Sequence, residues 1–180
     1  MSLADKISLL RILLAPCIVA CLVYYQPGRE ALRLIALALF LIGMVSDAVD
    51  GFVARSQRQP SQLGTILDPL ADKFLILSAL ISLSTIHALP EWMRIPAWFN
   101  LIVISRDVVL VAGTLLIFGF TGQLSVRPSR LGKWTVVAQM LVVPAALLGL
   151  PVKSALLMVA AALTILSGID YLRIGTKLLG

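Results

Sequence analysis

SDAVDGFVARSQRQPSQLGTILDPLADKF, residues 46–74, is the stretch of sequence that decides how this chain is interpreted. It carries four aspartates, Asp47, Asp50, Asp68 and Asp72, and long apolar segments flank it on both sides. Burying a carboxylate in apolar surroundings is costly unless a cation or hydrogen bonds compensate for it. We therefore expect these aspartates to have bound cations or ion-pair partners.

The composition is that of a protein embedded in a lipid bilayer. The 180 residues are 59% hydrophobic and only 13% charged, with a mean hydropathy of +0.99. Soluble domains are closer to half apolar and a quarter charged. The length suits a single domain, residues 1–180. The net charge of +6 does not indicate a nucleic-acid partner, because the basic residues are scattered between apolar blocks and form no stripe.

Six apolar runs of about 20 residues predict six transmembrane helices, because that length crosses the hydrocarbon core. The expected spans are 7–25, 32–54, 63–86, 95–118, 131–150 and 154–171. No A-x-A-like cleavage site follows the first run, so we interpret it as a retained helix. The expected fold is therefore an all-α polytopic membrane protein.

The distribution of basic residues between the two sides predicts the orientation. One side collects eight, namely Lys6, Arg55, Arg58, Arg127, Arg130, Lys133, Arg173 and Lys177. The other collects four, namely Arg29, Arg33, Arg94 and Lys153. Both termini are therefore expected in the cytoplasm, and the protein in the inner (cytoplasmic) membrane.

Three basic residues fall within the predicted spans: Arg11, Lys73 and Arg106. Ionisable residues are costly inside a membrane, so each is a candidate functional residue. Arg11 lies near the end of its span, and we expect its long side chain to reach the interface.

The spacing of the aspartates predicts that all four carboxylates face one gap. Asp47 and Asp50 are three residues apart, and Asp68 and Asp72 are four apart, so each pair lies on one face of a helix. The linking loop is short, which favours antiparallel neighbouring helices. Four ionised carboxylates in such a gap repel one another unless they are protonated or bind cations.

Two divalent ions would neutralise this cluster, and an all-oxygen ligand set suits Mg²⁺ or Mn²⁺ better than zinc. Paired metal ions of this kind clamp phosphate oxygens during an in-line displacement, which indicates phosphoryl transfer. The structural alternative is a set of salt bridges with Lys73 and Arg106, which leaves two of the four negative charges unmatched.

The neighbouring residues allow two interpretations. Gly51, Ala54 and Gly64 either keep a face open to a ligand or permit close helix packing. Arg55 either holds a diphosphate or anchors the helix on its cytoplasmic side.

The motif D-x2-D-G-x2-A-R-x8-G-x3-D-x3-D resembles the signature of the CDP-alcohol phosphotransferases. Every fixed position is matched, by Asp47, Asp50, Gly51, Ala54, Arg55, Gly64, Asp68 and Asp72. The resemblance implies six transmembrane helices, a homodimer, and an active site that opens to the cytoplasm. It further implies a CDP-linked lipid donor, CMP as the leaving group, and two divalent metal ions on the four aspartates.

The same resemblance implies roles for individual residues. Asp72 would be the base that takes the proton from the acceptor hydroxyl. Gly51, Ala54, Arg55 and Gly64 would contact the nucleotide and its diphosphate.

Three segments bear on the acceptor. ISLLRILLAP, residues 7–16, and LDPLADKF, residues 67–74, look like those of bacterial phosphatidylglycerophosphate synthases. That branch implies CDP-diacylglycerol as donor and glycerol 3-phosphate as acceptor. ISRDVVLVAG, residues 104–113, also resembles the related cardiolipin synthases, whose acceptor is phosphatidylglycerol. An inositol phosphate is a third candidate.

An acceptor phosphate needs Arg or Lys near the metal ions, and we expect Arg106, Lys133 and Arg173 to line its pocket. Anchoring at the membrane interface is the alternative role for Lys133 and Arg173. A different class of protein, a divalent-cation transporter, would also use clustered carboxylates. The four aspartates, however, gather towards one face of the membrane and do not mark a path across it, and Arg55 would repel cations.

Overall fold

The structure is a computed structural model that describes residues 3–28, 30–56, 62–121 and 130–179. Within these ranges, the side chains of residues 3–6, 47–56, 62–69, 116–118, 120–121, 130 and 174–179 are not described. The described chain forms six α-helices and no strand, which confirms the all-α class. The helices are α1 Leu3–Val23, α2 Glu30–Ser56, α3 Gln62–Thr85, α4 Ala97–Thr121, α5 Arg130–Leu147 and α6 Lys153–Leu179.

Glycine and proline residues lie in several of the segments between the helices. Gly28 lies between α1 and α2 with a φ of 99°, in the left-handed region that glycine adopts without steric cost. Gly149 follows α5 with a φ of 64°, and Pro151 lies two residues before Lys153, where α6 begins. Pro16 and Pro144 lie inside α1 and α5 without ending them.

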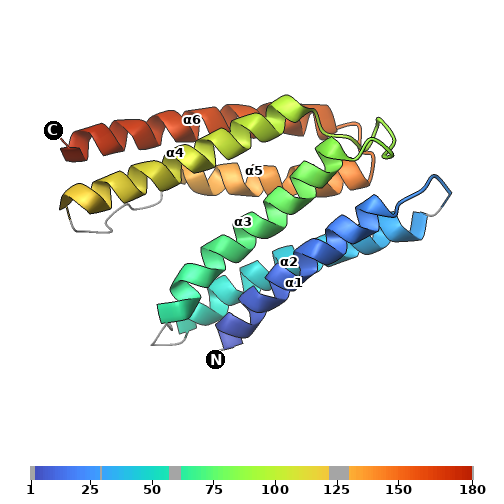
Figure 1. Cartoon of the computed structure of the whole chain (residues 1–180), viewed down its shortest axis with the longest axis horizontal. Helices are drawn as coiled ribbons and strands as arrows, with labels where there is room; N and C mark the ends of the chain where they lie inside the picture. Colours follow the sequence, from blue (N-terminus) through green and yellow to red (C-terminus); the bar gives the residue numbers. More distant parts are fainter. Residues whose placement is uncertain (1–2, 29, 57–61, 122–129, 180) are drawn as a thin grey trace. The chain divides into compact units, whose positions relative to one another are not determined.

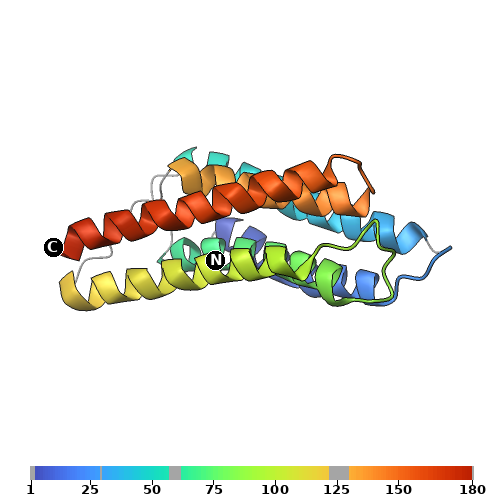
Figure 2. The ribbon, with the colours of Figure 1, turned by 90° about the horizontal axis from the view of Figure 1, so that it is seen from above.

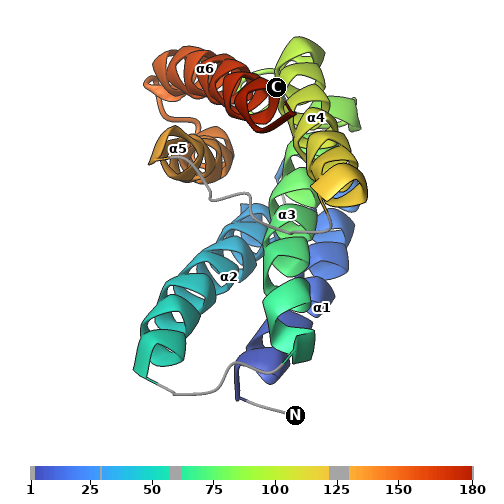
Figure 3. The ribbon, with the colours of Figure 1, turned by 90° about the vertical axis from the view of Figure 1, so that its left-hand side faces the viewer.

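The helices group into two compact units. The first comprises Met1–Ile95 and Val143–Leu150, and the second Pro96–Val142 and Pro151–Gly180. In the first unit α1 packs along both α2 and α3, whereas α2 and α3 contact each other much less (Figure 3). Helix α1 is therefore the central element of the unit that contains the aspartate motif.

Helices α2 and α3 approach each other at Gly43. A Cβ on Gly43 would lie 2.4 Å from Leu75 Cδ2, so glycine permits this close contact. Beyond this point the two helices diverge towards the ends that the short loop joins (Figure 3). The start of α1 lies at the same end of the unit (Figure 1).

The second unit is built on α4 and α6, which lie side by side along their lengths (Figures 1 and 2). Hydrogen bonds join α5 to α6: the Thr135 hydroxyl donates to the Leu163 carbonyl at 3.0 Å, and Gln139 Nε2 donates to Thr164 Oγ1 at 3.0 Å. Because neutral side-chain bonds of this kind suit apolar surroundings, they tie the helices together without buried charge.

Within the residues that the structure describes fully, two helices are long and apolar enough to cross a membrane, over Ala97–Leu115 in α4 and Lys153–Arg173 in α6. Large apolar side chains are exposed along both, such as Leu101, Leu115, Met158 and Leu166. Exposed apolar side chains in this number suit contact with lipid better than contact with water.

We expect Gly149→Ala to lower the melting temperature of the protein in detergent. Gly149 has a positive φ, and an added Cβ would lie 2.8 Å from Trp92 Cε3. The left-handed backbone alone costs a residue with a Cβ about 1–2 kcal/mol. Gly119→Ala is the matched control, because that helical glycine has nothing within 4 Å of the added Cβ. Equal melting temperatures for the two variants would contradict this prediction.

Candidate active site

The aspartate motif occupies the C-terminal end of α2 and the N-terminal end of α3, which follow each other in the sequence. The backbone of Asp47 and Asp50 lies in the last turns of α2, and that of Asp68 and Asp72 in the first turns of α3. Both pairs therefore keep their helical spacing, as the sequence predicts. The side chains of Asp47, Asp50 and Asp68 lie outside the described part of the structure.

The expected nucleotide contacts occupy the same two helix ends. Gly51, Ala54 and Arg55 belong to the last turns of α2, and Gly64 to the first turn of α3. The Arg55 side chain is also among those not described. The roles of these residues stay predictions.

Asp72 is the member of the motif whose side chain is described, and it forms an ion pair with Arg11 of α1. The guanidinium Nη1 of Arg11 donates a hydrogen bond to Oδ1 of Asp72. The Arg11 side chain is 1% exposed and that of Asp72 is 23% exposed. The buried guanidinium thus binds the carboxylate on its inner side, and the carboxylate remains partly accessible from outside.

The burial of Arg11 corrects one expectation. We expected its side chain to extend to the membrane interface, whereas it turns inward and contacts α3. The physical reason is its place on α1, since Ala15 and Ile18, one and two turns further along, are fully buried. A cation on the buried face of an apolar helix was the sequence signal for an interior partner.

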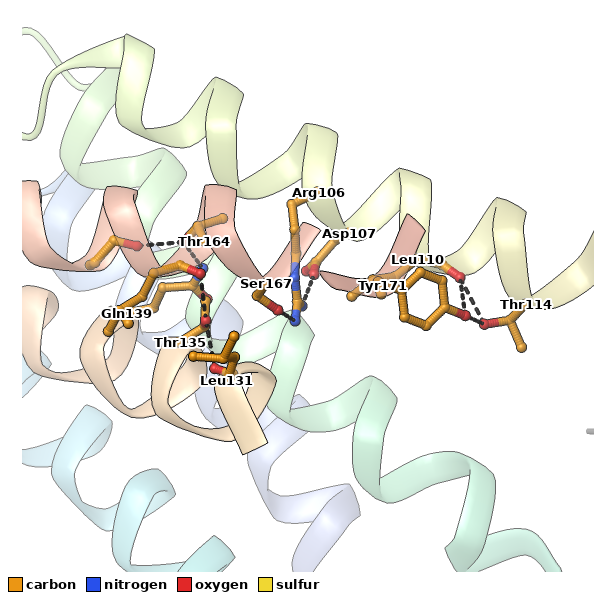
Figure 4. A network of polar contacts seen from close by, with 12 residues as sticks. Arg106, Asp107, Leu110, Thr114, Leu131, Thr135, Gln139, Thr164, Ser167 and Tyr171 are labelled. Atoms are coloured by element: carbon orange, nitrogen blue, oxygen red, sulfur yellow. Dashed lines mark hydrogen bonds and ion pairs between the residues drawn. The ribbon is translucent and has the colours of Figure 1, made fainter. Parts of the chain in front are cut away.

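The expected acceptor residues Arg106, Lys133 and Arg173 lie on α4, α5 and α6 of the second unit. Arg106 points between α4 and α6, where Nη1 contacts Asp107 Oδ1 at 2.8 Å and Nη2 donates to Ser167 Oγ at 2.9 Å (Figure 4). Its side chain is only 11% exposed. Lys133 and Arg173 are exposed.

Ser167 is a partner of Arg106 that the sequence did not reveal. It is 2% exposed and lies on α6, 61 residues from Arg106 along the chain. One turn beyond, the Tyr171 hydroxyl bonds with Thr114 and with the Leu110 carbonyl (Figure 4). The sequence signal for these contacts was the pair of polar side chains one turn apart on an otherwise apolar helix, because such side chains form hydrogen bonds to neighbouring helices.

A groove of about 380 Å³ runs along α4 and α6 beside Arg106. Apolar side chains line most of it, with Ser105, Arg106 and Thr164 as polar members. Gly168 forms part of the lining, and an added Cβ there would lie 3.7 Å from Arg106 Cγ. Among the described residues, none accepts a hydrogen bond from the Nε of Arg106.

The donor set suits a hard divalent cation. Asp72 presents a carboxylate that is partly exposed, and the sequence places three further carboxylates on the same two helix ends. Oxygen-only ligands favour Mg²⁺ or Mn²⁺. Within the described side chains, no group of three His, Cys, Asp or Glu residues gathers, and three of the four aspartates fall outside that set.

Comparison with known proteins identifies relatives over nearly the whole chain. A protein from Bacillus subtilis (strain 168) named CDP-diacylglycerol–glycerol-3-phosphate 3-phosphatidyltransferase is 34% identical over 187 residues, covering 94% of this chain and 93% of that protein. A Mycobacterium tuberculosis (strain H37Rv) protein named probable phosphatidylglycerophosphate synthase is 31% identical, covering 94% and 79%.

A third relative, from Cereibacter sphaeroides, carries the same name as the Bacillus protein and is 30% identical over 148 residues. The match covers 82% of this chain, which spans only 64% of that protein's length.

The family model for CDP-alcohol phosphatidyltransferase matches residues 1–166, which include every position of the aspartate motif. The resemblance drawn from the motif is thereby confirmed. The chain belongs to the CDP-alcohol phosphatidyltransferase family.

Proposed function

We propose that the chain transfers a phosphatidyl group from CDP-diacylglycerol to glycerol 3-phosphate, releasing CMP and forming phosphatidylglycerophosphate. The main support is the match over 94% of the chain to a relative that is named for this reaction. The complete eight-residue motif at the C-terminal end of α2 and the N-terminal end of α3 supports the same chemistry.

The reaction is a direct displacement at the β-phosphorus of the donor. The acceptor hydroxyl oxygen forms the new bond to phosphorus, and the bond between that phosphorus and CMP breaks. CMP leaves with the electron pair. Asp72 accepts the hydroxyl proton, since its carboxylate is partly exposed and held in place by Arg11.

Two divalent cations, Mg²⁺ or Mn²⁺, would be held by Asp47, Asp50, Asp68 and Asp72, and would supply charge stabilisation to the phosphate oxygens. Gly51, Ala54 and Gly64 would let the nucleotide approach the helix backbone. Arg55 would hold the diphosphate through its planar fork.

The acceptor phosphate would be bound by basic residues of the later helices, with Arg106 first among them. Arg106 projects between α4 and α6 and keeps Nε without an acceptor among the described residues. The phosphate of the acceptor substrate would accept a hydrogen bond from this Nε and would bring a negative charge opposite the guanidinium. Lys133 and Arg173, both exposed, would add positive charge for the same phosphate.

The wider architecture is part of the same proposal. Members of the family are membrane proteins, and we assign all six helices as transmembrane, with both termini and the active site on the cytoplasmic side of the inner membrane. Residues 1–180 then form one catalytic domain, which pairs with a second copy as a homodimer. The exposed apolar side chains on both units support contact with lipid.

An assay that offers both acceptors tests the proposal. The purified protein receives CDP-diacylglycerol, Mg²⁺, and either glycerol 3-phosphate or phosphatidylglycerol, and mass spectrometry identifies the lipid product. We expect phosphatidylglycerophosphate and an equal amount of CMP. Cardiolipin formed from phosphatidylglycerol, or product formed only with an inositol phosphate, would contradict the acceptor. Metal flux into liposomes without CMP release would contradict the transferase.

The same assay measures the role of Arg106. We expect Arg106→Gln to raise the KM for glycerol 3-phosphate by about 10-fold or more, because a charged hydrogen bond contributes about 1.5–3 kcal/mol. The KM for CDP-diacylglycerol should stay within a factor of about two, since Arg106 is not one of the motif residues. An equal rise in both KM values would contradict an acceptor-specific role.

A further inference from the structure

The buried side chains that the structure describes are apolar or neutral apart from that of Arg11, which is charged and 1% exposed. Its position follows from the pattern of α1, where Ser8, Ala15, Ile18 and Leu22 are also fully buried. These residues recur every three or four positions and so form one face of the helix. Arg11 lies on this face, and its guanidinium therefore reaches inward to Asp72 of α3.

Stability alone does not explain a cation at this place. Removing a guanidinium and a carboxylate from water is costly, and a well-packed apolar pair often stabilises an interface as well or better. The other described residues on the buried face of α1 are apolar or small, as that interface requires. An ionisable residue retained on such a helix points to a function for its partner.

We infer that Arg11 is a positioning residue that fixes the orientation of the Asp72 carboxylate for catalysis. This inference rests on the proposed function and extends it to a helix outside the aspartate motif. The planar guanidinium restricts the directions in which a carboxylate can accept its hydrogen bonds. Its contact with Oδ1 therefore limits rotation of the carboxylate about the Cβ–Cγ bond.

The burial of Arg11 makes this restraint permanent. The Arg11 side chain is 1% exposed, so a guanidinium that left Asp72 would lose a charged hydrogen bond with little water to replace it. The Asp72 side chain is 23% exposed, so its carboxylate stays accessible. The carboxylate thus arrives at the reaction already oriented, and no ordering of its side chain is needed at that moment.

Arg11→Met and Arg11→Lys test this inference. We expect Arg11→Met to lower kcat by about 100-fold, the scale expected for misplacing a reacting group by about 1 Å. The KM for CDP-diacylglycerol should change less than about 3-fold. Arg11→Lys keeps the charge and one donor, and should recover about 10-fold of the lost kcat. If Arg11→Met does not fold, Arg11→Lys alone tests the inference, and its kcat should be about 10-fold below that of the wild type.

Binding of Mn²⁺ provides a readout that does not need turnover. Loss of a group that orients a metal-binding carboxylate typically weakens metal binding by about 10-fold or more. We therefore expect calorimetry to show about 10-fold weaker Mn²⁺ binding by Arg11→Met than by the wild type. If the wild type transfers no phosphatidyl group, the proposed function is wrong, and Mn²⁺ binding then decides the Arg11 inference by itself.

Two variants control for a merely structural effect. Arg33→Met makes the same change in the same unit, removing the 2.8 Å ion pair with Glu30 and the stacking of Arg33 on Trp92 without touching Asp72. Gly149→Ala lowers stability far from Asp72 in the sequence. Both should keep wild-type kcat and Mn²⁺ binding below their melting temperatures. The inference is overturned if Arg11→Met also keeps wild-type kcat and Mn²⁺ binding. It is equally overturned if either control variant loses as much kcat and Mn²⁺ affinity as Arg11→Met.

Discussion

Asp72→Asn is expected to lower the rate of CMP release by about 1000-fold, within the range of about 10²–10⁴ that general base catalysis contributes. Asparagine keeps the size of the side chain but cannot accept the proton of the acceptor hydroxyl. It also removes one negative charge from the proposed metal ligands. The rate is measured with CDP-diacylglycerol and glycerol 3-phosphate at saturating Mg²⁺.

The ion pair with Arg11 gives this substitution a second consequence. Asparagine leaves the Arg11 guanidinium buried without a counter-charge from residue 72. Breaking a buried pair by removing one partner costs up to about 3–5 kcal/mol. We therefore expect Asp72→Asn to melt at a lower temperature than the wild type, and a loss of activity by this variant alone does not separate chemistry from folding.

The double variant Arg11→Met with Asp72→Asn separates the two effects. It removes both charges and places an apolar side chain of similar length at position 11. The large cost of breaking a buried pair comes from the charge left behind, and the double variant removes that charge. The melting temperature should return towards that of the wild type, while CMP release stays as low as in Asp72→Asn. Recovery of activity together with stability would contradict the assignment of Asp72 as the base.

Removing divalent cations with a chelator is expected to lower phosphatidyl transfer by at least about 100-fold. Metal ions on the phosphate oxygens contribute several kcal/mol of charge stabilisation, and each 1.36 kcal/mol is about a factor of ten in rate. The measurement is CMP release before and after dialysis against the chelator. Transfer at the wild-type rate after dialysis would refute the metal-dependent mechanism.

Returning single metal ions is the control for chelator damage. Mg²⁺ or Mn²⁺ should restore the rate, because both suit a small all-oxygen site. Zn²⁺ should restore less, since its protein sites usually include His or Cys. Restoration by Zn²⁺ alone would indicate a different ligand set from the four aspartates.

The helices could be predicted from the sequence because their signals are local. Apolar runs of nearly constant length, separated by polar or proline-containing segments, placed all six within a few residues of their observed ends, apart from the longer extension of α6 to Leu179. The expected fifth span, 131–150, included Gly149, whereas α5 ends at Leu147 and Gly149 has a positive φ, which few residues other than glycine adopt. That all six helices cross the membrane stays a prediction.

The aspartate motif is likewise a property of the sequence. The spacing of Asp47, Asp50, Asp68 and Asp72 along two helix ends needs only the helical period and a short loop. Together with the neighbouring glycines, alanine and arginine, this spacing is sufficient to indicate the family. The identity of the acceptor is not encoded in this local pattern, because the residues proposed to contact it lie on later helices.

Only the tertiary structure decided which charges meet. The sequence marked Arg11 and Arg106 as unusual, but not their partners, since each partner pair joins residues 61 positions apart. Packing of α1 against α3 brings Arg11 to Asp72, and packing of α4 against α6 brings Arg106 to Ser167. Helical period determines which face a residue occupies, whereas the helix opposite that face is set by how the apolar surfaces pack together.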